Sequence, residues 1–220
     1  KFYKNRFPKN DLSNVNIFNI WNNSNPILKH SPIDIYLRDR SLSNYRLASD
    51  LSHHPKLYLN GNYYHALIAG VNYLGTITAI HRTFIHSNGK AVTYNNGKKY
   101  KKSWGKLKGG AIRLVNNNPS NLYVSEGIES ALSYMKIHIN YIGDKSIWAG
   151  ISASNMMNLQ LPSKAGNLHL IPDNDPTGLS ASYHLMERAS KLGWKTFEHY
   201  PQTKGYDWND ELIKKEYING

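Results

Sequence analysis

Three acidic residues, far apart in the sequence, are placed where they could hold a divalent cation. Glu126 follows a short apolar run directly, and Asp173 and Asp175 follow another such run. Magnesium takes oxygen ligands, is commonly held by one or two carboxylates, and keeps waters that phosphate oxygens can replace. These side chains therefore predict a magnesium site, in which manganese could substitute, and chemistry on phosphate groups.

The segments around these acids alternate between strand-like and helix-like patterns, which is typical of parallel βαβ units. The expected strands are 122–125, 147–151, 168–172 and 195–200, and the expected helices are 128–139, 155–159 and 179–192. Gly193 is expected to close the last helix. Ligands of open α/β sheets gather at the carboxyl ends of the strands, which is where the three acids fall. Gly127 and Gly178 lack a Cβ atom and allow backbone or a substrate phosphate to come close there.

Each acid also has a purely structural interpretation. Asp175 before Pro176 has the pattern of a helix N-cap followed by proline in the first turn, and Asp173 could simply end a strand. Glu126 could be an acid favoured by the dipole at a helix start. The coincidence of all three acids at strand ends favours the metal site over three separate structural roles.

The first half of the chain has a different pattern. After a basic lead-in over residues 1–13, two short helices are expected, one of them beginning with Ser31 as N-cap and Pro32 in the first turn. From Lys56 onward, short β-rich runs are separated by Asn-Gly pairs, which supply the positive φ angles of tight hairpin turns. An antiparallel meander is therefore expected up to residue 115, followed by a linker over 116–120.

Positive charge is concentrated in this first half. Residues 1–120 hold 18 Lys and Arg against 4 Asp and Glu, whereas residues 121–220 hold 9 against 11. No acid lies between Asp50 and Glu126. We interpret this as a surface for a polyanion such as nucleic acid, with a merely solvated lysine face as the alternative. The candidate residues for binding nucleic acid or nucleotides are Arg82, Lys90, Lys98, Lys101, Lys102, Lys106 and Arg113.

Composition excludes several kinds of site. The 220 residues include no cysteine, so neither a disulfide framework nor a cysteine-ligated zinc ribbon is present, and a cytoplasmic location is expected. The longest apolar runs, such as 65–71, are too short to cross a bilayer, so no membrane partner is expected. Because the sequence begins with Lys1, we expect it to be a piece of a longer protein.

The same residues carry a resemblance to a known family. Glu-Gly at one strand end and Asp-x-Asp-x-x-Gly at a later one resemble the signature of Toprim domains, which occur in primases, topoisomerases and certain nucleases. Similarity to the Toprim primases of plasmids, phages and other mobile elements extends over further segments in the same order. These segments are 79–84, 88–91, 125–132, 149–154, 172–175 and 207–210.

The resemblance implies a fold, an activity and a set of residues. Residues 1–118 would be a basic, nucleic-acid-binding α+β region with short helices and the meander, and residues 119–220 an α/β Toprim domain with a mainly parallel sheet. The activity would be that of a DNA primase, a nucleotidyltransferase that makes primers on single-stranded DNA from nucleoside triphosphates, with a replicative helicase as partner. Glu126, Asp173 and Asp175 would be catalytic and hold magnesium, and Asp207 and Asp210 would be further metal ligands.

Two alternatives to a primase stay open. The acids alone do not separate synthesis from cleavage, so a Toprim nuclease or topoisomerase-like enzyme that cleaves phosphodiesters is one alternative. Many bacterial primases have an acid where this chain has Ser130, and Asn209 replaces a carboxylate of the later acidic motif. These two departures motivate the second alternative, a non-catalytic DNA-binding Toprim module of a larger replication protein.

Overall fold

The computed structural model describes residues 12–139 and 143–219, and the chain forms two compact units. The first unit comprises residues 1–39 and 50–107, and the second comprises 40–49 and 108–220. The short segment 40–49 thus belongs to the second unit, although both of its flanks in the sequence belong to the first.

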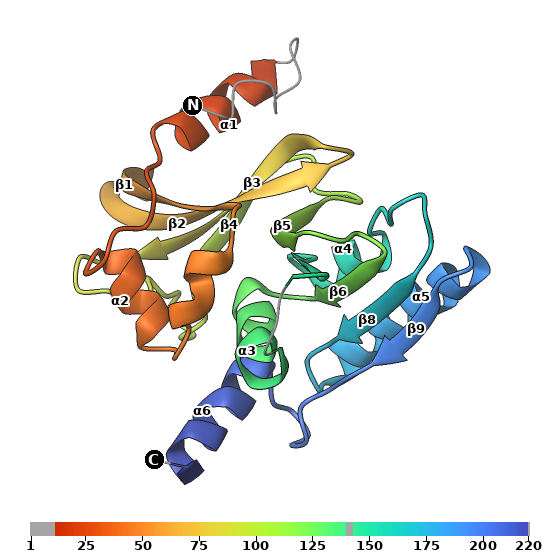
Figure 1. The fold of residues 1–220 in the computed structure, drawn as a ribbon. Coiled ribbons are helices and arrows are strands. Elements are labelled where there is room, and N and C mark those ends of the chain that lie inside the picture. Colours follow the sequence, from red (N-terminus) through yellow and green to blue (C-terminus); the bar gives the residue numbers. More distant parts are fainter. Residues whose placement is uncertain (1–11, 140–142, 220) are drawn as a thin grey trace. The chain divides into compact units, whose positions relative to one another are not determined.

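The first unit is an antiparallel sheet with two helices (Figure 1). Its strands pair in the order β1-β2-β3-β4, and each neighbouring pair is antiparallel. The elements are α1 (Leu12–Asn22), α2 (Pro32–Arg38), β1 (Leu51–Leu59), β2 (Asn62–Tyr73), β3 (Thr76–Ile85) and β4 (Lys101–Gly105). The predicted helices and antiparallel meander are confirmed. The chain between β3 and β4 forms only isolated bridges, Ile85 with Ala91 and Thr93 with Lys99, where longer strands were expected.

Local sequence explains two of these features. Asn60 and Gly61, between β1 and β2, have φ angles of 47° and 88°, and this pair of positive angles is what a two-residue hairpin turn requires. At the start of α2, the Ser31 side chain accepts a hydrogen bond from the backbone N–H of Asp34 at 3.3 Å. Pro32 then takes the first helical position, as the sequence predicts.

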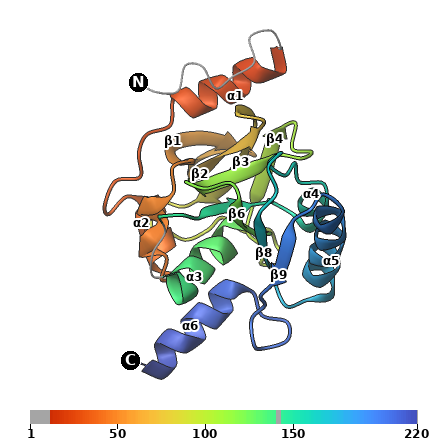
Figure 2. The same cartoon turned by 45° about the vertical axis from the view of Figure 1, so that its right-hand side comes forward.

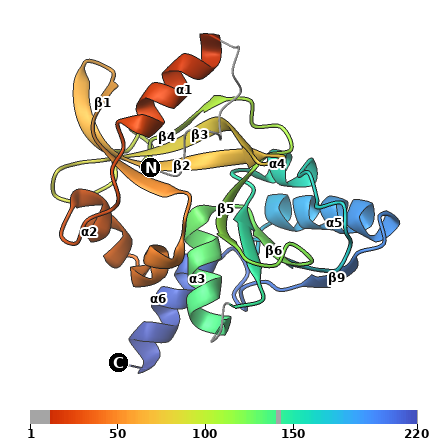
Figure 3. The same cartoon turned by 45° about the horizontal axis from the view of Figure 1, so that its top comes forward.

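Strand β2 is buried on both faces, because α1 packs on one side of the sheet and α2 on the other (Figures 1 and 3). On the α1 side, Ile17 and Trp21 form a core cluster with β-sheet residues such as Ile68. Gly70 makes room for this helix, since a Cβ atom there would lie 3.0 Å from the Trp21 ring. The first unit therefore has an apolar core of its own.

The second unit is a sheet in the order β5-β7-β6-β8-β9. Strand β5 is antiparallel to β7, and all other neighbours are parallel, which confirms the mainly parallel sheet. The strands are β5 (Ala111–Asn116), β6 (Asn121–Ser125), β7 (Ser146–Ala149), β8 (Asn167–Ile171) and β9 (Lys195–Glu198). The helices are a 3-10 helix (Ser43–Leu47), α3 (Ile128–His138), α4 (Ala153–Met157), α5 (Pro176–Lys191) and α6 (Trp208–Asn219). Of the helices in the described residues, none is long and apolar enough to span a membrane.

Two expectations are corrected by this arrangement. The run 111–115 was expected to continue the meander, but as β5 it belongs to the second unit and pairs with β7. No helix was expected after β9, whereas α6 occupies residues 208–219. The segment Asp207 to Asp210, taken from sequence as an acidic motif, is the start of that helix.

Strands β6 and β8 are parallel neighbours in the sheet of the second unit (Figure 2). Alternate residues of a strand face opposite sides of its sheet. Leu122 and Leu170 belong to a core cluster that also contains Leu185 of α5. On the other face, Tyr123 stacks on His169 with ring centroids 4.2 Å apart, and His169 stacks on Phe197 at 4.7 Å. Helix α5 ends at Lys191 and is followed by Gly193, whose φ of 84° lies in the left-handed region. This glycine stops the helix, as the sequence predicts.

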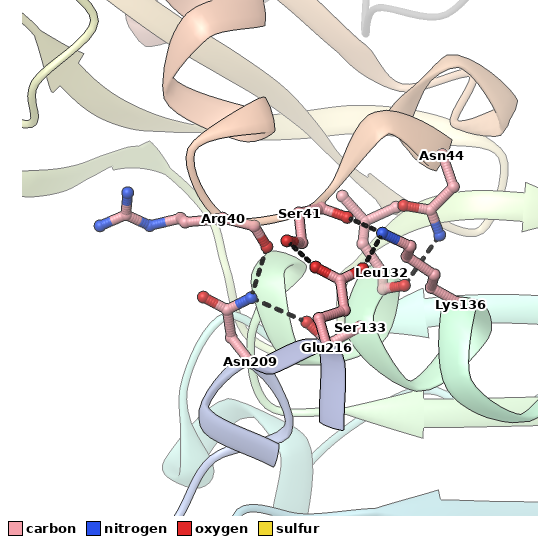
Figure 4. Close-up of polar contacts among 8 residues, drawn as sticks. All are labelled: Arg40, Ser41, Asn44, Leu132, Ser133, Lys136, Asn209 and Glu216. Carbon is pink, nitrogen blue, oxygen red and sulfur yellow. Dashed lines mark hydrogen bonds and ion pairs between the residues drawn. The ribbon is translucent and has the colours of Figure 1, made fainter. Parts of the chain in front are cut away.

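Hydrogen bonds fasten the segment 40–49 and helix α6 to helix α3 (Figure 4). The Asn209 side chain donates to the Arg40 carbonyl at 2.8 Å and to the Ser133 hydroxyl at 3.2 Å. Lys136 of α3 donates to the Ser41 carbonyl at 2.8 Å and pairs with Glu216 of α6 at 2.5 Å. These contacts join three segments that are distant in the sequence.

Two histidines of the first unit share a hydrogen bond across β1 and β2. The Nε2 atom of His53 lies 2.9 Å from Nδ1 of His65. Desolvation by burial, with smaller contributions from repulsion by His65 and His54, lowers the pKa of His53 to about 4. The folded protein therefore keeps His53 neutral at a pH where an exposed histidine is already protonated.

We predict that the chain loses stability through His53 as the pH falls from about 6.5, the pKa of an unfolded histidine, to about 4. In this range the unfolded state binds a proton that the folded state does not, so lower pH favours unfolding. The test is the free energy of unfolding in urea across this range. His53→Gln should reduce this pH dependence without abolishing it, because burial also lowers the pKa of His169 to about 4. Equal slopes for His53→Gln and the unaltered chain would contradict the prediction.

Candidate metal and nucleic-acid sites

Glu126 and Asp173 leave two adjacent parallel strands at the same edge of the sheet. The register of β6 and β8 pairs Ser125 with Ile171, so both acids come one or two residues after a matched pair. The loop after β7 lies at the same edge of the sheet, because the N–H of Ile151 in that loop donates to the Glu126 carbonyl at 2.7 Å. The predicted meeting of the acids at one edge of the sheet thus follows from strand register.

Asp173 is a partly buried carboxylate with a hydrogen-bond donor of its own. Its Oδ1 atom accepts a hydrogen bond from the Ser130 hydroxyl at 2.8 Å. Burial raises the pKa of Asp173 to about 7, although the hydrogen bond from Ser130 acts in the opposite direction. Repulsion by Asp207, Glu126 and Asp175 contributes to the rise. Three carboxylates therefore lie near enough to disfavour the charged form of Asp173.

Asp175 also has the structural role that its sequence suggested. It is the N-cap of α5, and its Oδ1 atom accepts a hydrogen bond from the Gly178 N–H at 2.8 Å, with Pro176 in the first turn. A carboxylate has two oxygens, so a cap made by Oδ1 leaves Oδ2 with acceptor capacity for another ligand. The cap fixes this side chain beside Asp173.

The two glycines at this edge have different surroundings. A Cβ atom on Gly178 would lie 2.6 Å from the Asp173 carbonyl oxygen, so the first turn of α5 packs against the backbone of Asp173. A Cβ atom on Gly127 would meet nothing nearer than 3.9 Å. Gly178 is thus needed for packing, and the space beside Gly127 is open.

The loop over residues 201–206 is tied to the segment that carries Asp173 and Asp175. The backbone N–H of Asn174 donates to the Tyr206 carbonyl at 2.9 Å, and the Asn174 carbonyl accepts from Gly205 at 2.7 Å. The Asn174 side chain donates to the Pro201 carbonyl at 2.8 Å. Trp208 Nε1 donates to the Pro172 carbonyl at 3.1 Å. Because Asp207 lies between Tyr206 and Trp208, these bonds hold it beside Asp173.

Asp207 and Asp210 begin α6 with reciprocal hydrogen bonds. The Asp210 N–H donates to Asp207 Oδ1 at 2.8 Å, and the Asp207 N–H donates to Asp210 Oδ2 at 3.2 Å. This is the geometry of a helix capping box. Asp210 is exposed, and of the two only Asp207 is a charged neighbour of Asp173. The role of Asp210 as a metal ligand stays a prediction.

Both positions that depart from the primase pattern make hydrogen bonds of their own. Ser130 donates to Asp173, and the buried Asn209 joins α6 to Arg40 and Ser133. Sequence reasoning assigned no role to Ser130 or to Asn174. The only available signal for Asn174 was its place between the two aspartates of the motif.

The donor set fits a hard cation that binds with few protein ligands. Within residues 12–139 and 143–219, no group of three or more His, Asp or Glu side chains is arranged closely enough to enclose a metal ion. The carboxylates are therefore neighbours and do not form a closed cage. Magnesium commonly binds in this way, through one or two carboxylates with waters and phosphate oxygens completing its shell.

Basic and aromatic side chains alternate on β3 and β4 of the first unit. Arg82 pairs with Lys102 across the strands, and its Nε atom donates to the Lys102 carbonyl at 3.3 Å. The Arg82 guanidinium lies over the Trp104 ring at 5.4 Å, and the Lys102 ammonium lies over the Tyr100 ring at the same distance. Trp104 is 39% exposed, so this strip is open to a ligand.

The remaining predicted basic residues are distributed over both units. Lys90, Lys98 and Lys106 are exposed in the first unit, and Lys101 is half-buried on β4. Arg113 lies on β5 of the second unit, with its guanidinium 4.7 Å from the centroid of the Trp148 ring. Six of the seven residues thus belong to the first unit.

Comparison with known families agrees with the geometry of the second unit. Residues 121–216 match the family described as Toprim domain. Most of the second unit is therefore similar to Toprim domains. Its mixed α/β structure and mainly parallel sheet are consistent with that assignment, and Toprim domains generally bind Mg²⁺. Residues 13–114 match a family described as a domain of unknown function, DUF7146.

Two solved structures are similar to the chain. One is a crystal structure of a DNA primase domain from Pseudomonas aeruginosa, with 14% identity and a TM-score of 0.42 over 88% of this chain and 59% of that one. The other contains the zinc-binding and RNA polymerase domains of the Aquifex aeolicus primase, with 12% identity and a TM-score of 0.43 over 83% of this chain and 46% of that one. The chain therefore spans less than two thirds of the length of either protein. No curated protein matches it.

We predict that Gly178→Ala and Gly127→Ala have different effects, although both glycines flank the acids. The new methyl group at 178 overlaps the Asp173 carbonyl. Such overpacking typically lowers the free energy of unfolding by about 1–3 kcal/mol. It should also displace Asp173 and weaken the binding of Mn²⁺. Gly127→Ala should fold normally. Urea unfolding and manganese titration of both variants test this, and equal stability and equal manganese affinity for the two would contradict it.

Proposed function

We propose that this chain is the catalytic core of a DNA primase, which makes primers on single-stranded DNA by magnesium-dependent nucleotidyl transfer. The observation that supports the proposal most is the placement of Glu126 and Asp173 at one edge of a Toprim sheet, with Asp175 and Asp207 beside them. Such a group of carboxylates is unfavourable alone and is stabilised by a bound cation.

Glu126, Asp173 and Asp175 would hold magnesium, with Asp207 and Asp210 as further ligands. When bound, magnesium supplies an electrophile that favours ionisation of the attacking 3′-hydroxyl and neutralises the charge of the triphosphate. The protein's contribution is to position the donors in advance. Ser130 orients Asp173 through its hydrogen bond, and the caps of α5 and α6 hold Asp175 and Asp207.

The first unit would bind the template and the incoming nucleotides. Its phosphate contacts would come from Arg82, Lys90, Lys98, Lys101, Lys102 and Lys106, with Arg113 contributing from the second unit. The region 1–118 would thus be the nucleic-acid-binding part and 119–220 the Toprim part. Support for this comes from the charge distribution and from the exposed basic and aromatic strip on β4.

Three further parts of the proposal rest on sequence resemblance and composition. The resemblance to primases of plasmids and phages suggests an origin in a mobile element. It also suggests a replicative helicase as partner. The absence of cysteine suggests that the protein works in the cytoplasm.

The direct test is incorporation of labelled nucleoside triphosphates on a single-stranded DNA template with magnesium. Asp173→Ala and Glu126→Ala should each lower the rate by about a hundredfold or more, because they remove charge that stabilises the transition state. Glu187→Gln, at a surface acid of α5, is the matched control and should retain full activity. Undiminished incorporation by the two alanine variants would contradict the proposed site.

Other outcomes of this experiment favour the two alternatives. Metal-dependent nicking of plasmid DNA without incorporation would favour phosphodiester cleavage by the same acids. DNA binding that survives chelation and triple substitution of Glu126, Asp173 and Asp175, with no catalysis, would favour a non-catalytic module. The hydrogen-bonded Ser130 and Asn209 at the departing positions are compatible with that last outcome.

A second prediction tests the nucleic-acid surface independently of catalysis. Lys102→Gln should weaken binding to single-stranded DNA regardless of its sequence, and should reduce the slope of log K against log salt by about 0.7. Lys164→Gln removes the same charge from an exposed position of the second unit and should change neither quantity. Fluorescence anisotropy over a range of salt concentrations measures both. Identical salt slopes for the unaltered chain and Lys102→Gln would remove Lys102 from the binding surface.

A further inference from the structure

The second unit contains a cavity for which the proposed reaction has no use. It lies where α3, α6 and the end of β9 meet, and its volume is about 310 Å³. Tyr134 and His138 contribute from α3, and His199 follows β9 directly. Helix α6 contributes Trp208, Glu211 and Lys215. The size is that of the smaller ligand pockets of proteins.

Flat rings form much of the cavity wall. The Tyr134 and Trp208 rings have centroids 4.8 Å apart and are nearly perpendicular, at 86°. His138 meets Trp208 in the same way, at 5.4 Å and 89°, and His199 lies 5.6 Å from Tyr134. Such walls favour a planar, polarisable ligand, which can pack its face and edge against rings of different orientation.

Glu211 stands out among the polar residues of the wall. The residue is only 4% exposed, and its Oε2 atom has no hydrogen-bond donor in the part of the chain that the structure describes. A buried carboxylate oxygen without a donor is costly, and in native proteins such a group calls for an explanation. Because Oε2 is itself buried, a ligand that brings N–H groups into the cavity would supply the missing donor once the Glu211 side chain turns toward it.

The charges around Glu211 narrow the ligand class. Burial, with repulsion by Lys215 and His199, lowers the pKa of His138, and attraction to Glu211 only partly opposes this. Burial likewise lowers the pKa of His199. Both imidazoles are therefore neutral near pH 7. Two carboxylates line the cavity, Glu211 and Glu198, and Glu198 already accepts a hydrogen bond from the Ser182 hydroxyl. Glu211 is thus the acceptor without a donor, and the half-buried Lys215 is a cation that can meet an anionic group. In the part of the chain that the structure describes, the side chains around this cavity include no group of three or more His, Asp or Glu placed to enclose a metal ion.

We propose that this cavity binds the base of a guanine nucleotide, with Glu211 accepting hydrogen bonds from the base and Lys215 facing the phosphate. Guanine carries two adjacent N–H donors, N1–H and the 2-amino group, on one edge of a planar ring. The N3–H of uracil lies between two carbonyl oxygens, which repel a carboxylate. Adenine and cytosine offer an amino group next to a ring nitrogen that is an acceptor.

The cavity adjoins the carboxylate group but does not depend on it. Trp208 lines the cavity, and its Nε1 atom also bonds to the carbonyl of Pro172, the residue before Asp173. Binding there can be measured without metal, template or catalysis. A failure of the proposed primase activity would therefore leave this inference standing, and the reverse is also true.

The experiment is isothermal titration of the unaltered chain with GMP, AMP, CMP and UMP, with EDTA present to exclude metal-mediated binding. GMP should bind at least about tenfold more tightly than UMP, a difference of about 1.4 kcal/mol. Glu211→Gln keeps the shape of the side chain and should weaken GMP binding by about tenfold or more. Its midpoint of thermal unfolding should be unchanged or higher, since it removes a buried charge that lacks a donor.

Two control variants test whether the loss of GMP binding is specific to Glu211. Glu187→Gln removes an acid from the surface of α5 and should bind GMP as the unaltered chain does, and so should Lys164→Gln, which removes a charge from an exposed position of the second unit. Any one of three results would overturn the inference: no GMP binding up to millimolar concentration, equal affinity for GMP and UMP, or GMP binding unaffected by Glu211→Gln. The comparison of nucleotides uses the unaltered chain, so it decides the question even if Glu211→Gln does not fold.

Discussion

The burial of Asp173 beside three other carboxylates is the constraint on which the candidate site of the second unit depends. The side chains of Asp175 and Asp207 are each held by hydrogen bonds that also cap a helix. Asp175 caps α5, Asp207 caps α6, and Glu126 is fixed through its carbonyl at the end of β6. The repulsion of Asp173 by these acids persists in the folded chain, and a divalent cation is the partner that would relieve it. Burial raises the pKa of Asp173 to about 7, and repulsion by these neighbours adds to the rise.

Much of the second unit could be predicted because its signals are local. Apolar periodicity located β6, α3, β8 and α5, and Gly193 located the end of α5. Helix α6 was not predicted because its pattern is weak: Ile213, Tyr217 and Ile218 are exposed, and its buried residues do not repeat clearly. The membership of 40–49 in this unit depends on bonds such as that between Asn44 and the Leu132 carbonyl, which link residues 88 positions apart. No local pattern carries that information.

In the candidate site, too, some residues could be predicted from local sequence and others depend on contacts between distant segments. Glu126, Asp173 and Asp175 could be found because strand ends can be read from sequence and parallel strands share an edge. The contact of Ser130 with Asp173 spans 43 positions and depends on how α3 lies against β8. The position of Asp207 depends on the loop that Asn174 ties down. The count of charged residues identified a basic region. It could not show that Arg113 lies on a strand of the second unit and not with the other basic residues of the first.

Diffraction from crystals of this chain soaked in manganese is the most direct measurement of the central claim. Our account predicts an anomalous peak at the carboxyl ends of β6 and β8, with oxygen ligands from Asp173 and from at least one of Glu126 and Asp175. A structure in which Glu126 points away from the two aspartates, with manganese bound only elsewhere on the protein, would contradict it.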